Sequence, residues 1–233
     1  MIFRQLFDAE SSTYTYLIAD EKTGQAALVD PVIANTDSYL LLLEQLQLKL
    51  IVAIDTHTHA DHITALGTLR DKTGCTTMLG QQALSECVSS TFADGDIIEI
   101  GDLQLQVLYT PGHTSDSYSF FLGNAEQPML FTGDTLLIRG TGRTDFQNGD
   151  AGQQYHSLLE VLLKFPDHTL VYPSHDYKGW TVSTVAEEKA HNPRLQVPDK
   201  QAYIELMANL HLPNPKMMDV AVPANQACGK PIA

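Results

Sequence analysis

The chain has 233 residues, of which 43% are apolar and 18% charged, a composition typical of ordinary globular proteins. Lysine and arginine number 14 against 28 aspartate and glutamate residues, which gives a formal net charge of -14. Such a charge repels the phosphate backbone that supplies most non-specific nucleic-acid affinity, so no nucleic acid is expected as a partner. The longest apolar runs, such as residues 50–54, fall far short of the ~20 residues that span a bilayer, so no membrane segment is expected.

The N-terminus and the cysteines indicate the same compartment. Residues 1–7 contain no basic region followed by an apolar core, so nothing there is typical of a secretory signal. Cys75, Cys87 and Cys228 form no CxxC pair and no even-numbered framework, which favours reduced thiols over a disulfide scaffold or a thiolate zinc site. A cytoplasmic location is therefore expected.

Short β-rich runs alternate with helical runs along the chain. Strands are predicted, in chain order, at residues 14–19, 25–29, 50–54, 75–79, 103–109, 118–122, 129–132 and 169–172. Helices are predicted at residues 38–47, 63–72, 81–88, 152–165, 182–190 and 199–210. This interleaving predicts an α/β or mixed α+β sandwich. Since no repeat or long linker interrupts it, a single domain is expected over residues 1–233, with a C-terminal tail from about residue 212 packed on it.

The most informative motif, HTHADH at residues 57–62, directly follows a buried strand. His57 and His59 leave that strand two residues apart, so an extended chain points both the same way, and the next turn can bring Asp61 and His62 around a second position. Imidazole and carboxylate ligands suit zinc, iron or manganese, not calcium. Four such ligands within six residues predict a metal site.

Three further predicted strands each end in one potential ligand. These are His113 after residues 103–109, Asp134 after 129–131, and His175 after 169–172. Sheets of α/β proteins place functional groups at such strand ends, so we expect these side chains to join the same site. The other four histidines, in helices or loops without such partners, are expected to be bystanders: His156, His168, His191 and His211.

The set HTHADH, PGH, TGD and PSH resembles the metal-binding motifs of the metallo-β-lactamase superfamily. The resemblance implies an αββα sandwich, with two mixed β-sheets flanked by helices and the metal at one edge. Further motifs resemble the persulfide dioxygenases (sulfur dioxygenases), a branch related to glyoxalase II: TGDTLLIRGTGRTDFQ (132–147), YPSHDY (172–177), TVST (181–184), NPR (192–194) and VPAN (222–225).

The narrower resemblance implies a reaction. By analogy with the family, His57, His113 and Asp134 bind one Fe(2+) per chain, and two histidines with one carboxylate leave positions open for substrate and O₂. Glutathione persulfide and O₂ would give sulfite and glutathione. The family often forms dimers, so the resemblance suggests a homodimer.

His59, Asp61, His62 and His175 leave an alternative open. In dinuclear hydrolases of the superfamily these positions build a second metal site, whose bridging hydroxide attacks a carbonyl. A glyoxalase II-type hydroxyacylglutathione thioester hydrolase is therefore the alternative, although only 58 residues follow His175, few for the helical substrate domain of those enzymes. In the dioxygenase the same residues would orient ligands and water. A metal-binding module without catalysis is a third possibility, disfavoured by the complete ligand set.

Substrate contacts are predicted from charge. Arg139 and Arg143 are the first basic residues after a gap of 66 residues, and a guanidinium can bind a carboxylate of glutathione through two hydrogen bonds. The alternative is that each pairs with a neighbour such as Asp145. The family's HDY motif suggests that Tyr177 lies near the iron, the alternative being a tyrosine packed in the sandwich.

Overall fold

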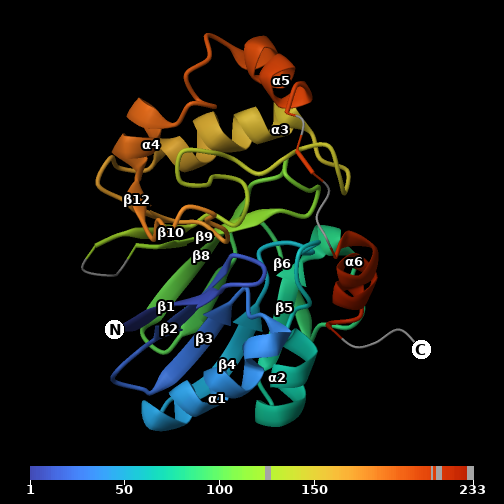
Figure 1. Cartoon of the computed structure of the whole chain (residues 1–233). Helices are drawn as coiled ribbons and strands as arrows, with labels where there is room; N and C mark the ends of the chain where they lie inside the picture. Colours follow the sequence, from blue (N-terminus) through green and yellow to red (C-terminus); the bar gives the residue numbers. More distant parts are fainter. Residues whose placement is uncertain (124–126, 211, 214–216, 230–233) are drawn as a thin grey trace. The chain divides into compact units, whose positions relative to one another are not determined.

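The computed structural model describes residues 1–123, 127–210, 212–213 and 217–229 (Figure 1). The backbone forms two compact units. The first comprises residues 1–92 and 97–105 with the C-terminal segment from residue 214, and the second comprises residues 93–96 and 106–213. The single-domain organisation stays a prediction.

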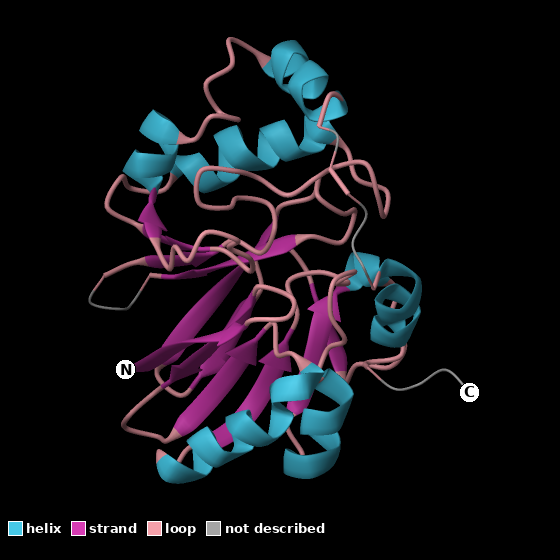
Figure 2. Cartoon of the chain, viewed as in Figure 1, coloured by secondary structure: helices cyan, strands magenta, loops and turns pink. Residues whose placement is uncertain are grey.

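The first unit is built on a mixed sheet with the order β1-β2-β3-β4-β5-β6. Its strands are β1 (Ile2–Asp8), β2 (Thr13–Ala19), β3 (Gln25–Val29), β4 (Lys49–Ile54), β5 (Thr76–Gly80) and β6 (Ser90–Phe92). The first three strands are antiparallel neighbours joined by tight connections, whereas β3 to β6 run parallel. A parallel pair needs a crossover, which α1 (Thr36–Gln45) and α2 (Leu66–Thr73) provide (Figure 2).

The core of the first unit lies between this sheet and its helices. Leu43 of α1 and Leu66 and Leu69 of α2 are buried in one cluster with Leu28 and Ala53 of the sheet. Leu43 therefore lies on the packed face of α1, whereas Leu41 of the same helix is 53% exposed. Each such side chain, when fully buried, contributes roughly 1.5–3 kcal/mol to folding.

The second sheet has the order β12-β11-β10-β9-β8-β7. Its strands are β7 (Ile97–Ile100), β8 (Leu103–Tyr109), β9 (Tyr118–Leu122), β10 (Met129–Phe131), β11 (Leu170–Tyr172) and β12 (Ser183–Thr184). The strand β7 and the start of β8 belong to the first unit. Because β10 pairs antiparallel with β9 and parallel with β11, this sheet is also mixed.

Helices of the second unit pack on that sheet. They are α3 (Ala151–His156), continued by a π-turn (Ser157–Val161) and a 3₁₀ turn (Leu162–Lys164), then α4 (Val185–His191) and α5 (Lys200–Ala208). Leu158, Leu162 and Tyr203 are buried against Leu130 and Val171 of the sheet. The predicted helix at residues 152–165 therefore exists, but its hydrogen-bond pattern changes twice.

Most predicted elements are present, and one is wrong. In place of a helix at residues 81–88, the chain makes a single 3₁₀ turn, Gln81–Ala83, and Leu84 then takes a left-handed conformation that ends it (φ +51°). The strands β1, β6 and β7 and the helix α6 (Met218–Gln226) were not predicted, and the start of the helix predicted at residues 182–190 forms the strand β12 instead. The strand β1 forms through register pairing with β2, from Ile2↔Ala19 to Asp8↔Thr13, which no local pattern encodes.

The prediction of reduced thiols is wrong for two of the three cysteines. Cys87 and Cys228 form a disulfide across a sequence separation of 141 residues, and Cys75 is a buried free thiol. Both bonded cysteines belong to the first unit. The C-terminal segment that carries α6 is thereby tied to the chain between β5 and β6.

Candidate metal centre

The loop after β4 brings its histidines close together. His57 and His59 are buried, at 2% and 0% exposure, and their ring centroids lie 4.2 Å apart. His59, Asp61 and His62 each offer one ligand atom, all within 4.8 Å of one another. Nδ1 of His62 lies 2.8 Å from Asp61 Oδ2. The turn after the strand therefore gathers three of the motif's four predicted ligands into one potential metal-binding group.

Asp30, which the sequence analysis did not select, orients two of these histidines. It follows β3, and its carboxylate accepts hydrogen bonds from the Thr56 amide (2.7 Å) and the Thr56 hydroxyl (3.0 Å). His59 Nε2 lies 3.1 Å from the same carboxylate. The Thr56 hydroxyl, having donated its proton, accepts from His57 Nδ1 at 2.9 Å. Asp30 lies at the end of a strand, which is the signal that identified the other ligands and would also have identified Asp30.

These contacts determine which nitrogen of each ring carries the proton. A carboxylate only accepts, so Nε2 of His59 is a donor, and in the neutral ring that binds a metal Nδ1 is the Lewis base. For His57 the order is reversed, with Nδ1 as the donor and Nε2 as the Lewis base. Hydrogen bonds of this kind hold metal-ligating histidines in one tautomer and one orientation.

A second acidic group lies beneath His59. Asp30, Asp55 and His59 are all buried and offer ligand atoms within 4.8 Å of one another. Burial, together with the charge of Asp30, raises the pKa of Asp55 to about 7. Burial alone would lower the pKa of His59, but the carboxylates of Asp30, Asp61 and Asp55 raise it to about 9. A positive charge, from a proton or a metal ion, is therefore stabilised here.

The second unit assembles its own ligands around Asp134. His113 Nδ1 lies 2.7 Å from the carbonyl oxygen of Arg143, and its Nε2 lies 3.5 Å from Asp134 Oδ2. The other oxygen, Asp134 Oδ1, lies 2.7 Å from His175 Nδ1. One carboxylate thus lies between two imidazoles, a set of nitrogen and oxygen donors that fits zinc, iron or manganese.

Two glycines permit the close packing around His113 and Asp134. Gly112, just before His113, has φ +139°, and a Cβ there would lie 2.3 Å from Gln154 Cα. A Cβ on Gly142 would lie 2.3 Å from the Asp134 carbonyl oxygen and 2.8 Å from the His113 ring. Gly112 of the PGH motif and Gly142, the second glycine of the GTGR motif, are therefore required by packing.

Both predicted substrate arginines are paired with carboxylates. Arg143 binds Asp145 through two hydrogen bonds, Nε to Oδ1 at 2.7 Å and Nη2 to Oδ2 at 2.8 Å. Arg139 pairs with Glu187 at 2.6 Å and with the buried Glu188. Neighbour pairing, the alternative considered for each arginine, is thus present, and substrate contact stays a prediction.

Tyr177 lies at the surface. Its side chain is 71% exposed, which excludes the alternative of a tyrosine packed in the sandwich. The ring stacks on His175, with centroids 6.1 Å apart and planes inclined by 7°. The stacking connects Tyr177 to the ligand group of the second unit, but contact with substrate stays a prediction.

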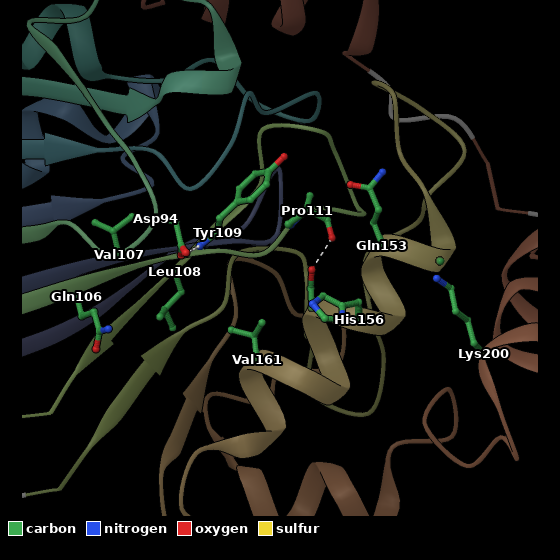
Figure 3. A pocket seen from close by; sticks show the side chains of 13 residues that line it. Asp94, Gln106, Val107, Leu108, Tyr109, Pro111, Gln153, His156, Val161 and Lys200 are labelled. Atoms are coloured by element: carbon green, nitrogen blue, oxygen red, sulfur yellow. Dashed lines mark hydrogen bonds between the residues drawn. The ribbon is translucent and has the colours of Figure 1, made fainter.

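Among the described residues, the potential metal-binding groups include none of the predicted bystanders His156, His168 and His191. The fourth, His211, lies outside the described residues. A pocket of ≈ 650 Å³ in the second unit is lined by Tyr109, His156, Lys200 and neighbouring side chains (Figure 3). It contains none of the candidate ligands. Within the described ranges, no helix has the length and apolar character to cross a membrane.

Comparison with known proteins gives consistent similarities. The chain matches the Metallo-beta-lactamase superfamily over residues 9–86 and 90–175. The mouse protein named Persulfide dioxygenase ETHE1, mitochondrial, is 44% identical over 230 residues, covering 98% of this chain and 89% of that protein. A probable hydroxyacylglutathione hydrolase of Schizosaccharomyces pombe is 32% identical, covering 88% of this chain and 90% of that protein.

The crystal structure of ETHE1 from Myxococcus xanthus is similar with a TM-score of 0.95 and 55% sequence identity. The match covers 99% of this chain and 100% of that one. Together with the superfamily match, it confirms the predicted fold class of two mixed sheets flanked by helices.

Proposed function

Because the chain belongs to the persulfide dioxygenase family of the metallo-β-lactamase superfamily, we propose that this enzyme oxidises glutathione persulfide with O₂ to sulfite and glutathione. The observation that carries the proposal is the 44% identity to a persulfide dioxygenase over 98% of the chain. It is supported by the 55% identity to the Myxococcus xanthus ETHE1 structure.

The proposed cofactor is one Fe(2+) per chain, with His57, His113 and Asp134 as its ligands. Fe(2+) held by two imidazoles and one carboxylate supplies open positions at which O₂ and a persulfide sulfur can react. The tautomers support this ligand set, since Nε2 is the Lewis base of both His57 and His113. The carboxylate Asp134 is oriented by its 2.7 Å contact with His175.

The remaining motif residues have a supporting role in this proposal. His59, Asp61 and His62 lie next to His57 along the chain, and Asp30 links His59 and Thr56 through one carboxylate. Such contacts orient metal ligands, and losing them commonly weakens metal binding 10- to 100-fold. His175, held by Asp134, does the same for the carboxylate ligand.

A hydroxyacylglutathione thioester hydrolase is the second candidate, and one observation favours it. The group His59, Asp61 and His62 has the composition of a further metal site. The similarity is lower, however, with 32% identity to a probable hydrolase against 44% to a persulfide dioxygenase. The dioxygenase is therefore the better-supported function.

For the anionic substrate, Arg143 is the better candidate of the two arginines. The Arg143 side chain is 13% exposed but its partner Asp145 is 54% exposed, so Asp145 can turn to water when a substrate carboxylate replaces it. Arg139 pairs with a fully buried glutamate, whose charge would lose its partner. Tyr177, exposed and stacked on His175, is the proposed third contact.

A cytoplasmic location and a homodimer are also proposed, on the sequence and the family resemblance respectively. The mouse relative carries the word mitochondrial in its name. Cell fractionation tests the first proposal, and light scattering of the purified protein tests the second. A membrane or organelle fraction, or a monomeric mass, would contradict them.

The test of the function is oxygen uptake. Protein loaded anaerobically with Fe(2+) should contain close to one iron per chain and consume O₂ when glutathione persulfide is added. Lactoylglutathione should not be hydrolysed. Absence of O₂ uptake with iron present would reject the proposal, and lactoylglutathione turnover with two metals per chain would favour the hydrolase.

A further inference from the structure

The side chain of Asn225, in α6, contacts the backbone of the HTHADH loop. It is 2% exposed, and its Nδ2 donates to the carbonyl oxygens of His59 and His62, both at 2.8 Å. Its Oδ1 accepts from the Thr64 amide at 2.8 Å. Carbonyl oxygens only accept and the amide only donates, so the orientation of this carboxamide is determined by its partners.

These hydrogen bonds supply partners for backbone groups of the HTHADH loop. Residues 57–62 lie outside helices and strands, so their buried backbone groups need partners from elsewhere. Asn225 binds one carbonyl on each side of Asp61 and the amide two residues after His62. The three bonds therefore hold the segment that presents His59, Asp61 and His62.

The end of α6 is itself anchored. Cys228, three residues after Asn225 and fully buried, forms the disulfide with Cys87. Its carbonyl oxygen accepts from the Gly67 amide at 3.0 Å. The helix belongs to the first unit and lies near the chain between β5 and β6 (Figure 1). A covalent bond thus holds the segment from which Asn225 reaches the loop.

We propose that Asn225 is a positioning residue for the metal-binding loop, and that the Cys87–Cys228 disulfide makes this positioning depend on thiol redox state. The inference rests on the proposed role of residues 57–62 in metal binding. It does not depend on which reaction the bound metal supports.

Reduction would proceed by ordinary thiol exchange. A small thiolate attacks the sulfur of Cys87, the partly exposed partner, and the sulfur–sulfur bond breaks to release the Cys228 thiolate. A second thiolate then displaces Cys87, so two small thiols become one disulfide and the protein gains two cysteine thiols. The end of α6 loses its covalent anchor, and the loop is then held by hydrogen bonds alone.

Asn225→Asp tests the positioning role, with Gln226→Asp as the matched control. The aspartate keeps the size and the acceptor for Thr64, but cannot donate to the two carbonyl oxygens. Gln226 is the next residue and is exposed, so its substitution makes the same charge change away from the loop. Circular dichroism checks that each variant is folded.

The readout is the affinity of the metal-free protein for Fe(2+), measured anaerobically against a chromophoric chelator. Asn225→Asp should weaken binding about 10-fold or more, and Gln226→Asp should stay within about twofold of the parent. The absorption spectrum of the Co(2+)-loaded protein reports the ligand geometry of the folded state, and it should change only for Asn225→Asp. A variant that merely loses stability keeps this geometry and therefore keeps the parent spectrum. An affinity within twofold of the parent for Asn225→Asp overturns the positioning role.

The redox arm needs no substitution. Parent protein is compared oxidised and after reduction, with the reductant removed, and Fe(2+) should bind several-fold more weakly to the reduced form. Equal affinities of the oxidised and reduced protein overturn the redox dependence. If Asn225→Asp does not fold, this comparison is the deciding test. Parent protein that binds Fe(2+) but consumes no O₂ would reject the dioxygenase function while leaving this inference standing.

Discussion

His113 donates its Nδ1 proton to the carbonyl oxygen of Arg143, 2.7 Å away. The carbonyl oxygen can only accept, so Nδ1 carries a proton, and Nε2, which lies 3.5 Å from Asp134 Oδ2, is the nitrogen available to a metal. Two motifs 30 residues apart, PGH and GTGR, therefore act together. The backbone of the second sets the tautomer of the histidine in the first.

Gly142→Ala should disturb this relationship. Its Cβ would lie 2.3 Å from the Asp134 carbonyl oxygen and 2.8 Å from the His113 ring, so both ligands must move. We expect a loss of about 1–3 kcal/mol in the free energy of unfolding, together with weaker Fe(2+) binding. Gly140→Ala is the matched control, because its Cβ would meet only Leu137, at 3.9 Å. Equal effects of the two substitutions in denaturant unfolding and metal titration would contradict this account.

Arg143→Ala should raise KM for glutathione persulfide about tenfold while kcat changes little, because a charge-assisted hydrogen bond contributes about 1.5–3 kcal/mol. The main-chain carbonyl that binds His113 is retained in this variant. Asp145→Ala removes the competing carboxylate and should lower KM. Steady-state kinetics of the iron-loaded variants measures both, and an unchanged KM in Arg143→Ala would refute the substrate contact.

Arg139→Ala should destabilise the fold far more than Arg143→Ala. It leaves Glu188, at 0% exposure, without its guanidinium, and an uncompensated buried charge costs about 3–5 kcal/mol. In Arg143→Ala the carboxylate left behind, Asp145, is 54% exposed and is hydrated, so the loss of this ion pair should cost about 1 kcal/mol or less. Adding Glu188→Gln to Arg139→Ala should restore part of the stability. Urea unfolding compares all three, and similar costs for the two arginines would be inconsistent with the buried pair.

Asp150 caps α3 by accepting from the Gln153 amide at 2.9 Å. Asp150→Ala should cost about 1 kcal/mol. The hydrogen bond from the Gln153 backbone lowers the pKa of Asp150 below 3.8, so its charged form stabilises the fold above that value. This contribution should disappear as the pH falls through the lowered pKa.

Asp150→Asn keeps an acceptor without the charge and provides the comparison. Thermal unfolding from pH 7 to pH 2 should show the parent more stable than this variant near neutrality, with the difference vanishing in acid. A difference that persists unchanged at pH 2 would show that the charge is not responsible.

Local sequence was sufficient for much of the fold and for most candidate ligands. A buried strand and the residues that follow it are encoded within a few positions, so β4, β8, β10 and β11 and the histidines or aspartate after them could be predicted. Asp30 carries the same signal after β3, but forms its contacts with Thr56 and His59 only when β3 and β4 pair.

Local patterns failed where a residue's state depends on a distant partner. The helix predicted at residues 81–88 is replaced by a turn, and Cys87 there is bonded to a cysteine 141 positions away. Neither the disulfide nor the α6 contacts have a short-range signal.

The sequence by itself determined the chemical nature of the site: imidazoles and carboxylates at strand ends, a charge of -14 that disfavours nucleic acid, and motifs that resemble persulfide dioxygenases. Only the tertiary structure decided which nitrogen of each histidine carries a proton, that Arg143 has Asp145 as its partner, and that Asn225 supports the loop. The physical reason is range: residue type and strand periodicity are local properties, whereas hydrogen-bond partners are chosen when packing brings remote segments within about 3 Å.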